Sequence, residues 1–306
     1  MLGIDPLIVA FGLGVGILIG LTGIGGGSLM TPLLILFGGI QPVVAIGTDL
    51  AYGAITKTVG GWRHFRMGTV DLGISIWLAI GSVPGSLVGV ALVERLHDTY
   101  GKDFDSILLS CVAGALMVVA VAILGRALFA TRLVASERHD VPLNRTTKSL
   151  AVGIGSILGL ILGLTSVGSG ALIGLTLILI FRLTPHRVVG TDVFHAALLL
   201  WVAGFAHFVS GNVDLGLMGT ILIGSIPGVW IGTGLLPRVP SDALRPALGV
   251  VLLASALGVL SKAGADVPAV AIIGVPAAVG VLAWIIHNVR ARSGLIPPTP
   301  PAPERA

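Results

Sequence analysis

Apolar residues along this chain come in long continuous runs. Several runs reach or approach the roughly 20 residues that a helix needs to cross a bilayer. A membrane β-barrel would instead show segments of about ten residues that alternate between apolar and polar. The pattern therefore predicts an all-α, polytopic membrane protein with about 9–11 membrane segments. The expected segments are 6–22, 28–38, 42–62, 70–93, 106–125, 149–165, 169–181, 185–207, 213–236, 242–261 and 267–288.

A polar, glycine-rich stretch interrupts the first apolar region. Residues 20–32 read GLTGIGGGSLMTP, and a similar phrase, GLTSVGSGAL, returns at 163–172. Each glycine inside a helix costs about 0.5–1 kcal/mol relative to alanine, so both stretches predict a broken backbone. The apolar pieces that follow, 28–38 and 169–181, are too short for a full crossing, so they are half-helices or parts of re-entrant pairs.

The two stretches belong to an internal repeat. When 20–92 is compared with 163–235 without gaps, roughly two in five positions are identical. The identities include polar residues in fixed register: Pro42, Gly47, Thr48 and Asp49 match Pro185, Gly190, Thr191 and Asp192. Shared polar positions favour duplication over the chance similarity of two apolar sequences. A further break is expected in the first half at the Pro-Gly pair that contains Pro84, whose counterpart in the second half is Pro227.

Composition supports a membrane protein and excludes a nucleic-acid-binding one. The chain is 55% hydrophobic and 10% charged, and its net charge of +4 is spread over 306 residues without a basic cluster. The start of the chain lacks the basic residues of a secretory signal, so the first segment is expected to be retained. Cys111, the single cysteine, lies in an apolar run and is expected to be a buried, inert thiol.

Basic residues predict the orientation of the segments, because cytoplasmic loops are enriched in lysine and arginine. The Arg-rich loop 126–148 is placed in the cytoplasm, which puts the N-terminus outside and the C-terminus inside. The equivalent turns 63–69 and 206–213 then lie on opposite faces, so the halves form an inverted-topology repeat. The expected units are a first membrane repeat 1–125, the cytoplasmic loop 126–148, a second repeat 149–262, an extra C-terminal transmembrane helix 263–290 and a disordered tail 291–306.

The glycine breaks are candidate anion-binding positions. Backbone N–H groups at the start of a helix are free to donate and carry about half a positive charge, which favours anions in a low-dielectric setting. The alternative is that small residues only let helices pack closely. The candidate substrate-binding residues are Thr22, Gly25, Gly26, Gly27, Ser28, Thr48, Lys57, Thr165, Gly168, Ser169, Gly170 and Thr191.

Three ionisable side chains inside the spans are candidates for coupling to a proton or another ion: Asp49, Asp192 and His195. The aspartates could instead cap a neighbouring half-helix, and the histidine could be a satisfied core residue. Lys57 has the apolar Leu200 as its counterpart in the second half. Its ammonium group would pair with a substrate anion or an aspartate, or reach the membrane interface.

These motifs resemble the TauE/SafE family of sulfite-exporter-like permeases. GLTGIGGG and GLTSVGSG, each followed about 20 residues on by Pro…GTD and later by a Pro-Gly span, carry the resemblance over nearly the whole chain. It implies a multi-pass inner-membrane transporter of sulfur-containing anions such as sulfite or an organosulfonate, in an antiport or ion-coupled mode. The family's glycine-rich motif falls on Gly25 to Ser28 and Gly168 to Ala171.

The sequence thus predicts a secondary transporter that works by alternating access, in which one repeat rocks against the other. The expected partners are a small anionic substrate, the lipid bilayer and a coupling proton or ion, and a homodimer is one option for the assembly. No cofactor, metal or nucleic acid is expected. Two alternatives stay open: a passive anion channel, and an intramembrane enzyme that uses Asp49 and Asp192 as a paired acid and base.

Overall fold

The computed structural model describes residues 5–22, 26–129, 141–235 and 241–292, and these residues form helices connected by short turns without any β-strand. All the segments expected from the sequence are present as helices. Their bounds are α1 (Pro6–Thr22), α2 (Gly27–Leu36), α3 (Pro42–Arg66), α4 (Leu72–Tyr100), α5 (Lys102–Phe129), α6 (Arg145–Thr165), α7 (Leu172–Leu179), α8 (Pro185–Val209), α9 (Leu215–Leu235), α10 (Ser241–Lys262) and α11 (Ala269–Arg292).

Six of the described helices are long and apolar enough to cross a membrane, which confirms the polytopic helical class. Large apolar side chains cover their outer surfaces, for example Trp230, Val270 and Trp284. A soluble protein rarely exposes apolar area on this scale, whereas lipid would cover it. The polar helix α3 is not among the six, because it carries Asp49, Lys57 and several basic residues.

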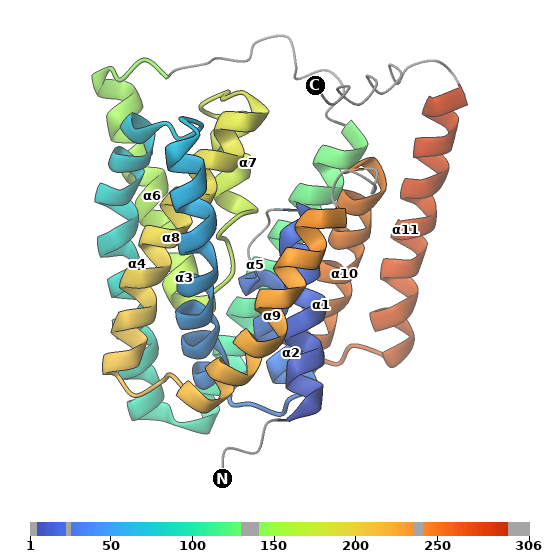
Figure 1. Ribbon diagram of the computed structural model, residues 1–306. Coiled ribbons are helices and arrows are strands. Elements are labelled where there is room, and N and C mark those ends of the chain that lie inside the picture. Colours follow the sequence, from blue (N-terminus) through green and yellow to red (C-terminus); the bar gives the residue numbers. More distant parts are fainter. Residues whose placement is uncertain (1–4, 23–25, 130–140, 236–240, 293–306) are drawn as a thin grey trace.

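The two short helices, α2 and α7, run back to opposite ends of the molecule (Figure 1). Helix α1 rises from the lower end of Figure 1, and α2 returns to that end before α3 begins. Helix α6 descends from the upper end, and α7 returns to it before α8 begins. The pieces before and after each glycine break therefore form re-entrant pairs, and the two pairs have inverted orientations.

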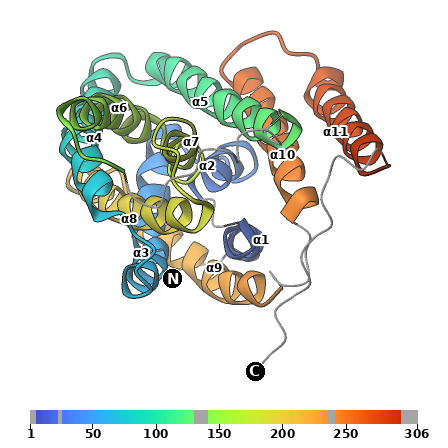
Figure 2. The ribbon, with the colours of Figure 1, turned by 90° about the horizontal axis from the view of Figure 1, so that it is seen from above.

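The central helices confirm the inversion. Helices α3 and α8 occupy equivalent places in the repeat and pack against each other in opposite directions. The start of α3, at Gly47, lies against Asn212, just beyond the end of α8, while Gly61 near its end lies against Phe194 near the start of α8. Helices α5 and α10 form a second antiparallel pair of equivalents. In Figure 2 α5 and α10 lie side by side, and an axis that relates two antiparallel helices runs across them rather than along them.

Glycines join each half to the other. The most extensive helix contacts pair α1 with α9 and α4 with α6, so each re-entrant pair lies against a helix of the opposite half. Backbones touch along both contacts: a Cβ on Gly20 would lie 2.9 Å from the Cα of Gly232. Glycines at every fourth position make this approach possible. They are Gly12, Gly16 and Gly20 with Gly224, Gly228 and Gly232, and Gly81, Gly85 and Gly89 with Gly155, Gly159 and Gly163.

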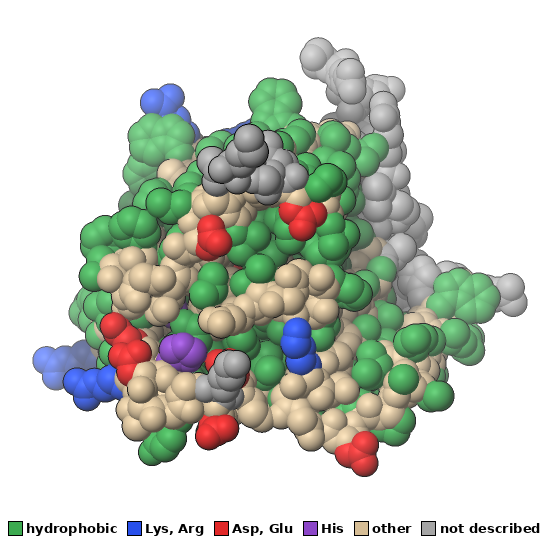
Figure 3. All heavy atoms as spheres, turned by 90° about the horizontal axis from the view of Figure 1, so that it is seen from below, with side chains coloured by type: hydrophobic (Ala, Val, Ile, Leu, Met, Phe, Trp, Pro, Cys, Tyr) green, Lys and Arg blue, Asp and Glu red, His purple; other side chains and the backbone are tan. Residues whose placement is uncertain are grey.

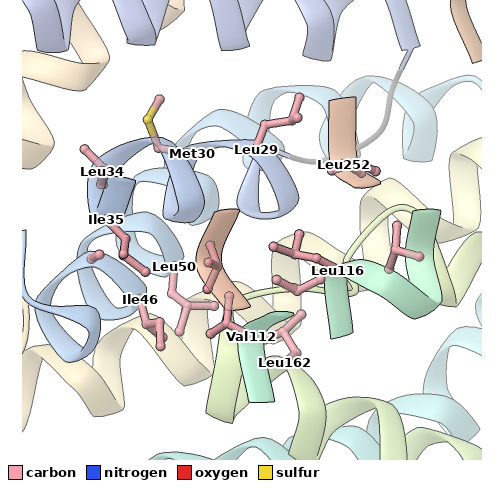
Figure 4. Close-up of a cluster of buried hydrophobic side chains, with 14 of the residues drawn as sticks. Leu29, Met30, Leu34, Ile35, Ile46, Leu50, Val112, Leu116, Leu162 and Leu252 are labelled. Atoms are coloured by element: carbon pink, nitrogen blue, oxygen red, sulfur yellow. The ribbon is translucent and has the colours of Figure 1, made fainter. Parts of the chain in front are cut away.

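Helix α2 lies in the apolar core (Figure 4). Its side chains, among them Met30 and Leu34, are fully buried with Leu50 of α3, Leu116 of α5 and Leu252 of α10 around them. A helix that is apolar on all sides is stable only when it is enclosed. The surrounding helices thus hold the first break at a fixed position inside the protein.

Two sequence-based expectations are wrong. Cys111 is exposed on the outer side of α5, because the apolar run in which it lies faces outward as well as inward. Helix α4 also continues through Pro84 without a break, as its counterpart α9 does through Pro227, since neighbouring helices can support a transmembrane helix around a missing hydrogen bond. Residues 130–140 of the expected loop and 293–306 of the expected tail lie outside the described residues, while the flanking parts of the loop belong to the end of α5 and the start of α6.

Basic residues gather at the upper end of Figure 1, where α3 ends and α6 begins. Arg63, Arg66, Arg145, Lys148 and Arg187 belong to this end. The lower end carries most of the acidic residues, which Figure 3 shows scattered over that face. They include Asp98, Asp103, Asp105, Asp214 and Asp266. Arg95, Lys102 and Lys262 also lie at the lower end, so the excess of basic residues at the upper end is relative rather than complete.

Candidate functional site

The two glycine breaks meet inside the protein, and one carboxylate lies between them. A Cβ on Gly27, at the start of α2, would lie 3.0 Å from the Ser166 hydroxyl and 3.3 Å from Asp49 Oδ2. That oxygen accepts hydrogen bonds from Thr31 of α2 at 2.6 Å and from Ser166 of the second break at 2.5 Å. Asp49 therefore links the helix after the first break to the backbone of the second.

The second break owes its shape to residues with positive φ. Ser166 ends α6 in the left-handed conformation with φ of 60°, and Gly168 and Gly170 follow with φ of 125° and 99°. Glycine adopts such angles at no steric cost, so this backbone depends on both glycines. The turn directs the N–H of Gly170 at Asp192 Oδ1, 3.2 Å away. The second break therefore binds an internal carboxylate.

Lys57 is a buried cation without a hydrogen-bond partner. Its side chain is 5% exposed, and the ammonium Nζ is enclosed without any acceptor within hydrogen-bond distance. Asp192 and Asp49 both act on it electrostatically, yet neither carboxylate lies within hydrogen-bond distance of its ammonium group. Reaching the membrane interface is therefore not what this lysine does. It faces two carboxylates inside the protein and contacts neither.

A tyrosine and a histidine occupy equivalent positions one turn after the aspartates. His195 of α8 shares a hydrogen bond of 3.1 Å with Ser82 of α4. Tyr52 of α3 is fully buried, and its hydroxyl lies beside the first break, 2.8 Å from where a Cβ on Gly26 would be. The hydroxyl of Ser225 of α9, the counterpart of Ser82, lies beside the Tyr52 hydroxyl.

Three candidate threonines have structural roles in this conformation. Thr48 accepts a hydrogen bond from the N–H of Asp214 at 3.0 Å, and Thr191 accepts one from the N–H of Asp71 at 2.8 Å. Asp214 is the N-cap of α9 and Asp71 is the N-cap of α4, so each bond joins a threonine of one repeat to the start of a helix in the other. Thr165 donates to Ile161 within its own helix.

The other candidate residues either are buried at the breaks or lie outside the described residues. Gly26, Gly27, Ser28 and Ser169 are buried beside the breaks, whereas Gly25 and the side chain of Thr22 lie outside the described residues. Sequence reasoning missed several residues of the site. They are Thr31, Tyr52, Ser166 and Ser225. A usable signal existed for two of them: Ser166 is a hydroxyl inside the second motif, and Tyr52 is the counterpart of His195.

The carboxylates are not arranged as an aspartyl acid–base pair, which would require a shared hydrogen bond between them. In the part of the chain that the structure describes, Asp49 is bonded to Thr31 and Ser166 and Asp192 to Gly170. The arrangement instead combines a lysine, two carboxylates and several hydroxyl groups around broken helices in a bilayer-spanning fold. Ion and substrate sites of secondary transporters are built in this way.

Comparisons with known proteins agree with this architecture. Residues 8–259 match the family model for the sulfite exporter TauE/SafE. The probable membrane transporter protein YjnA of Bacillus subtilis is 38% identical over 250 residues, which are 82% of this chain and 97% of the relative. The probable membrane transporter protein YdhB of the same organism is 29% identical over 244 residues, 78% of this chain and 95% of the relative.

A probable membrane transporter protein of Xylella fastidiosa (strain 9a5c) is 27% identical over 273 residues, 87% of this chain and 99% of the relative. No solved structure matches the chain. The family match covers both glycine breaks and every helix from α1 to α10, and the relatives are aligned over nearly their whole lengths. The chain therefore belongs to the TauE/SafE family of membrane transporters.

Proposed function

We propose that this protein is a secondary transporter that moves a small sulfur-containing oxyanion, such as sulfite or an organosulfonate, by alternating access. The observation that carries the proposal is the position of Lys57. A buried ammonium group without a partner costs far more than a paired one, so its retention beside two broken helices points to an anion that visits it. The name of the family model, sulfite exporter, supports the choice of anion.

Charge balance makes the transport ion-coupled. The site holds one cation, Lys57, and two carboxylates, Asp49 and Asp192. If all three are ionised, an arriving monoanion adds to an existing excess of negative charge in a low-dielectric environment. A proton that binds together with the anion offsets the charge that the anion adds, and Asp49, Asp192 and His195 are the groups that can accept it. Anion and proton would then cross together.

The glycine contacts suggest which parts move. Because α1 packs against α9 and α6 against α4, a motion of one whole repeat against the other would separate both glycine pairs. We therefore expect each pair to move as one body. The α4–α6 pair packs more closely on α8 than the α9–α1 pair packs on α3. In the opposite state of an inverted repeat the two pairs would exchange these arrangements, so that the α9–α1 pair packs closely on α3 and the α4–α6 pair packs loosely on α8.

Transport into proteoliposomes tests the proposal. Purified protein should take up radiolabelled sulfite with saturation, and a trapped pH indicator should report protons that move with it. Empty liposomes give the leak. Flux that rises linearly with concentration and ignores a pH gradient would identify a channel instead. If sulfite, sulfate and methanesulfonate all move no faster than in empty liposomes, the proposed function is wrong.

A further inference from the structure

His207 is a fully buried histidine near the end of α8, away from the groups that the proposed function uses. Its Nε2 lies 3.3 Å from the carbonyl oxygen of Gly163, close to the end of α6. A carbonyl oxygen can only accept a hydrogen bond, so Nε2 must carry the hydrogen. In the neutral imidazole the other ring nitrogen, Nδ1, is therefore an acceptor with a free lone pair.

This Nδ1 is buried and has no hydrogen-bond partner among the described residues. Native proteins leave few buried polar atoms unpaired, so an unpaired acceptor indicates that something binds to it at some stage. An imidazole nitrogen with a free lone pair takes up a proton near neutral pH. The geometry of His207 thus fixes both the tautomer of the ring and the atom that a proton would reach.

Glu94 of α4 supplies the charge that would stabilise a protonated His207. The glutamate is half-buried and acts electrostatically on the histidine, whereas the neighbouring Arg95 is exposed. A proton on Nδ1 would create an attraction to this carboxylate, which water screens only in part. It would also strengthen the bond to the Gly163 carbonyl, since hydrogen bonds from a charged donor are roughly twice as strong as neutral ones.

The other elements that touch His207 contribute uncharged groups. On α3 a Cβ on Gly47 would lie 3.2 Å from the His207 Cβ, and in the turn before α9 the N–H of Asn212 donates to the His207 carbonyl. The acidic residues that follow these contacts in the chain are Asp49 and Asp214, and both already accept hydrogen bonds within the protein. A proton on His207 would therefore act mainly through α4 and α6.

His64, the counterpart of His207 in the first half, is bonded differently. Its Nδ1 shares a hydrogen bond of 3.0 Å with Thr69, in the turn that follows its own helix α3. The residue equivalent to Gly163 is Gly20 of α1, which His64 does not bond in the part of the chain that the structure describes. The difference matches the packing of the helices, because the α4–α6 pair lies more closely on α8 than the α9–α1 pair lies on α3.

We propose that His207 is a proton-binding site that ties the α4–α6 pair to α8, so that a proton on Nδ1 favours the described arrangement over the opposite one. The inference rests on the proposed alternating access and adds a proton site apart from the three coupling candidates. Loss of the proton would weaken the bond to Gly163 and remove the attraction to Glu94. Because the proton binds one state better, pH sets the ratio of the two states.

Spin labels on α4 and α8 test this directly. In a Cys111→Ala background, which has no other cysteine, Leu92→Cys and Val209→Cys place exposed labels near the lower ends of the two helices. Electron paramagnetic resonance then gives the distribution of distances between the labels. Between about pH 8 and pH 5, where histidine titrates, we expect the ratio of the short to the long distance to rise at least about threefold.

Variants assign the effect to the histidine. His207→Gln keeps an N–H for the Gly163 carbonyl but cannot bind a proton, so the distance ratio should no longer change with pH. Glu94→Gln removes the carboxylate and should give a smaller change than the wild type. His186→Gln, at the exposed start of α8, is the matched control and should respond to pH as the wild type does. Melting temperatures at neutral pH show whether each variant is folded.

Two results would overturn the proton site. One is a distance ratio in the wild type that does not change with pH. The other is the wild-type pH response in both His207→Gln and Glu94→Gln; a lower melting temperature with this response intact would give His207 a structural role only. The distances are measured without substrate, so failure of sulfite uptake in liposomes would refute the proposed function and can be told apart from either result.

Discussion

At the scale of single residues, Lys57 is expected to serve transport at a cost in the stability of the fold. Its ammonium group is buried without a partner, so an apolar side chain of similar length would remove a desolvation penalty. Lys57→Met should therefore abolish sulfite uptake while it leaves the melting temperature unchanged or raises it. Uptake assays and thermal unfolding of the purified protein measure the two effects.

Lys148 supplies the matched control for this prediction. It lies near the start of α6, at the opposite end of this helix from the second break, and its ammonium group is 4.9 Å from the centre of the Trp77 ring. Lys148→Met should keep transport. Uptake by Lys57→Met at the wild-type rate would contradict a role for this lysine in anion binding.

The threonines of the two Gly-Thr-Asp motifs give the opposite expectation. Thr48 and Thr191 each accept a backbone N–H from an N-cap of the other half. Valine has nearly the same shape but cannot accept, so the N–H would be buried without a partner. Thr48→Val and Thr191→Val should each lower the free energy of unfolding by about 1–3 kcal/mol. The KM for sulfite should stay the same.

Denaturation and uptake measurements on the same preparations check this. The exposed Thr146 provides Thr146→Val, which should be neutral in both assays. A raised KM without loss of stability in either motif variant would return that threonine to the substrate-binding group, where the sequence pattern had placed it.

Residue-scale prediction from the sequence was limited by distance along the chain. The importance of Asp49 was visible from its polar character inside a span. Its partner Ser166 lies 117 positions away, and no local pattern announces that contact. Glycine at 23, the counterpart of Ser166, has no side chain, so the internal repeat does not indicate the hydroxyl either.

At the scale of helices, the glycine contacts yield the sharpest test of packing. A Cβ on Gly159 of α6 would lie 2.6 Å from the Cα of Ser82 in α4, whereas a Cβ on Gly153 of the same helix meets no atom within 4 Å. Gly159→Val should destabilise the protein by about 1–3 kcal/mol or more, because two backbones must separate. Gly153→Val makes the same change in helix propensity without a close neighbour, so it should be tolerated.

Yield of folded protein by size-exclusion chromatography and melting temperature compare the two variants. Equal behaviour of Gly159→Val and Gly153→Val would show that the α4–α6 contact is looser than described. Helix α1 offers a second matched set, since Gly16 faces the backbone of α9 while Gly14 meets nothing within 4 Å.

The ends of the helices were predictable because the local sequence sets them, whereas the helices against which each one packs were not. Long apolar runs bounded by glycine, proline and charge fixed the ends of most helices to within a few residues, and clustered glycines marked both breaks. The chain has 45 glycines, however, so a spacing of four does not reveal which two helices touch. Only the folded chain shows that the glycine-rich faces join opposite halves.

At the scale of the whole molecule, the distribution of charge predicts orientation. The upper end of Figure 1 carries the basic clusters and should face the cytoplasm, which places the lower end, with the start of α1, outside. In a Cys111→Ala background, Ala265→Cys at the lower end and Leu143→Cys at the upper end are exposed probes.

A membrane-impermeant maleimide applied to intact cells should label Ala265→Cys only. Leu143→Cys should react after the cells are permeabilised. Labelling of Leu143→Cys in intact cells, with Ala265→Cys protected, would reverse the assigned orientation while it leaves the fold unaffected.

The crossed glycine contacts also bear on how the chain is assembled during synthesis. Helix α1 ends at Thr22, but its partner α9 starts only at Leu215, so the first helix must reside in the bilayer with its glycine face uncovered until the second half has been inserted. Neither half is complete as a folding unit. A gene that encoded one half alone could yield this architecture only if two copies of its product inserted in opposite directions and exchanged their first helices.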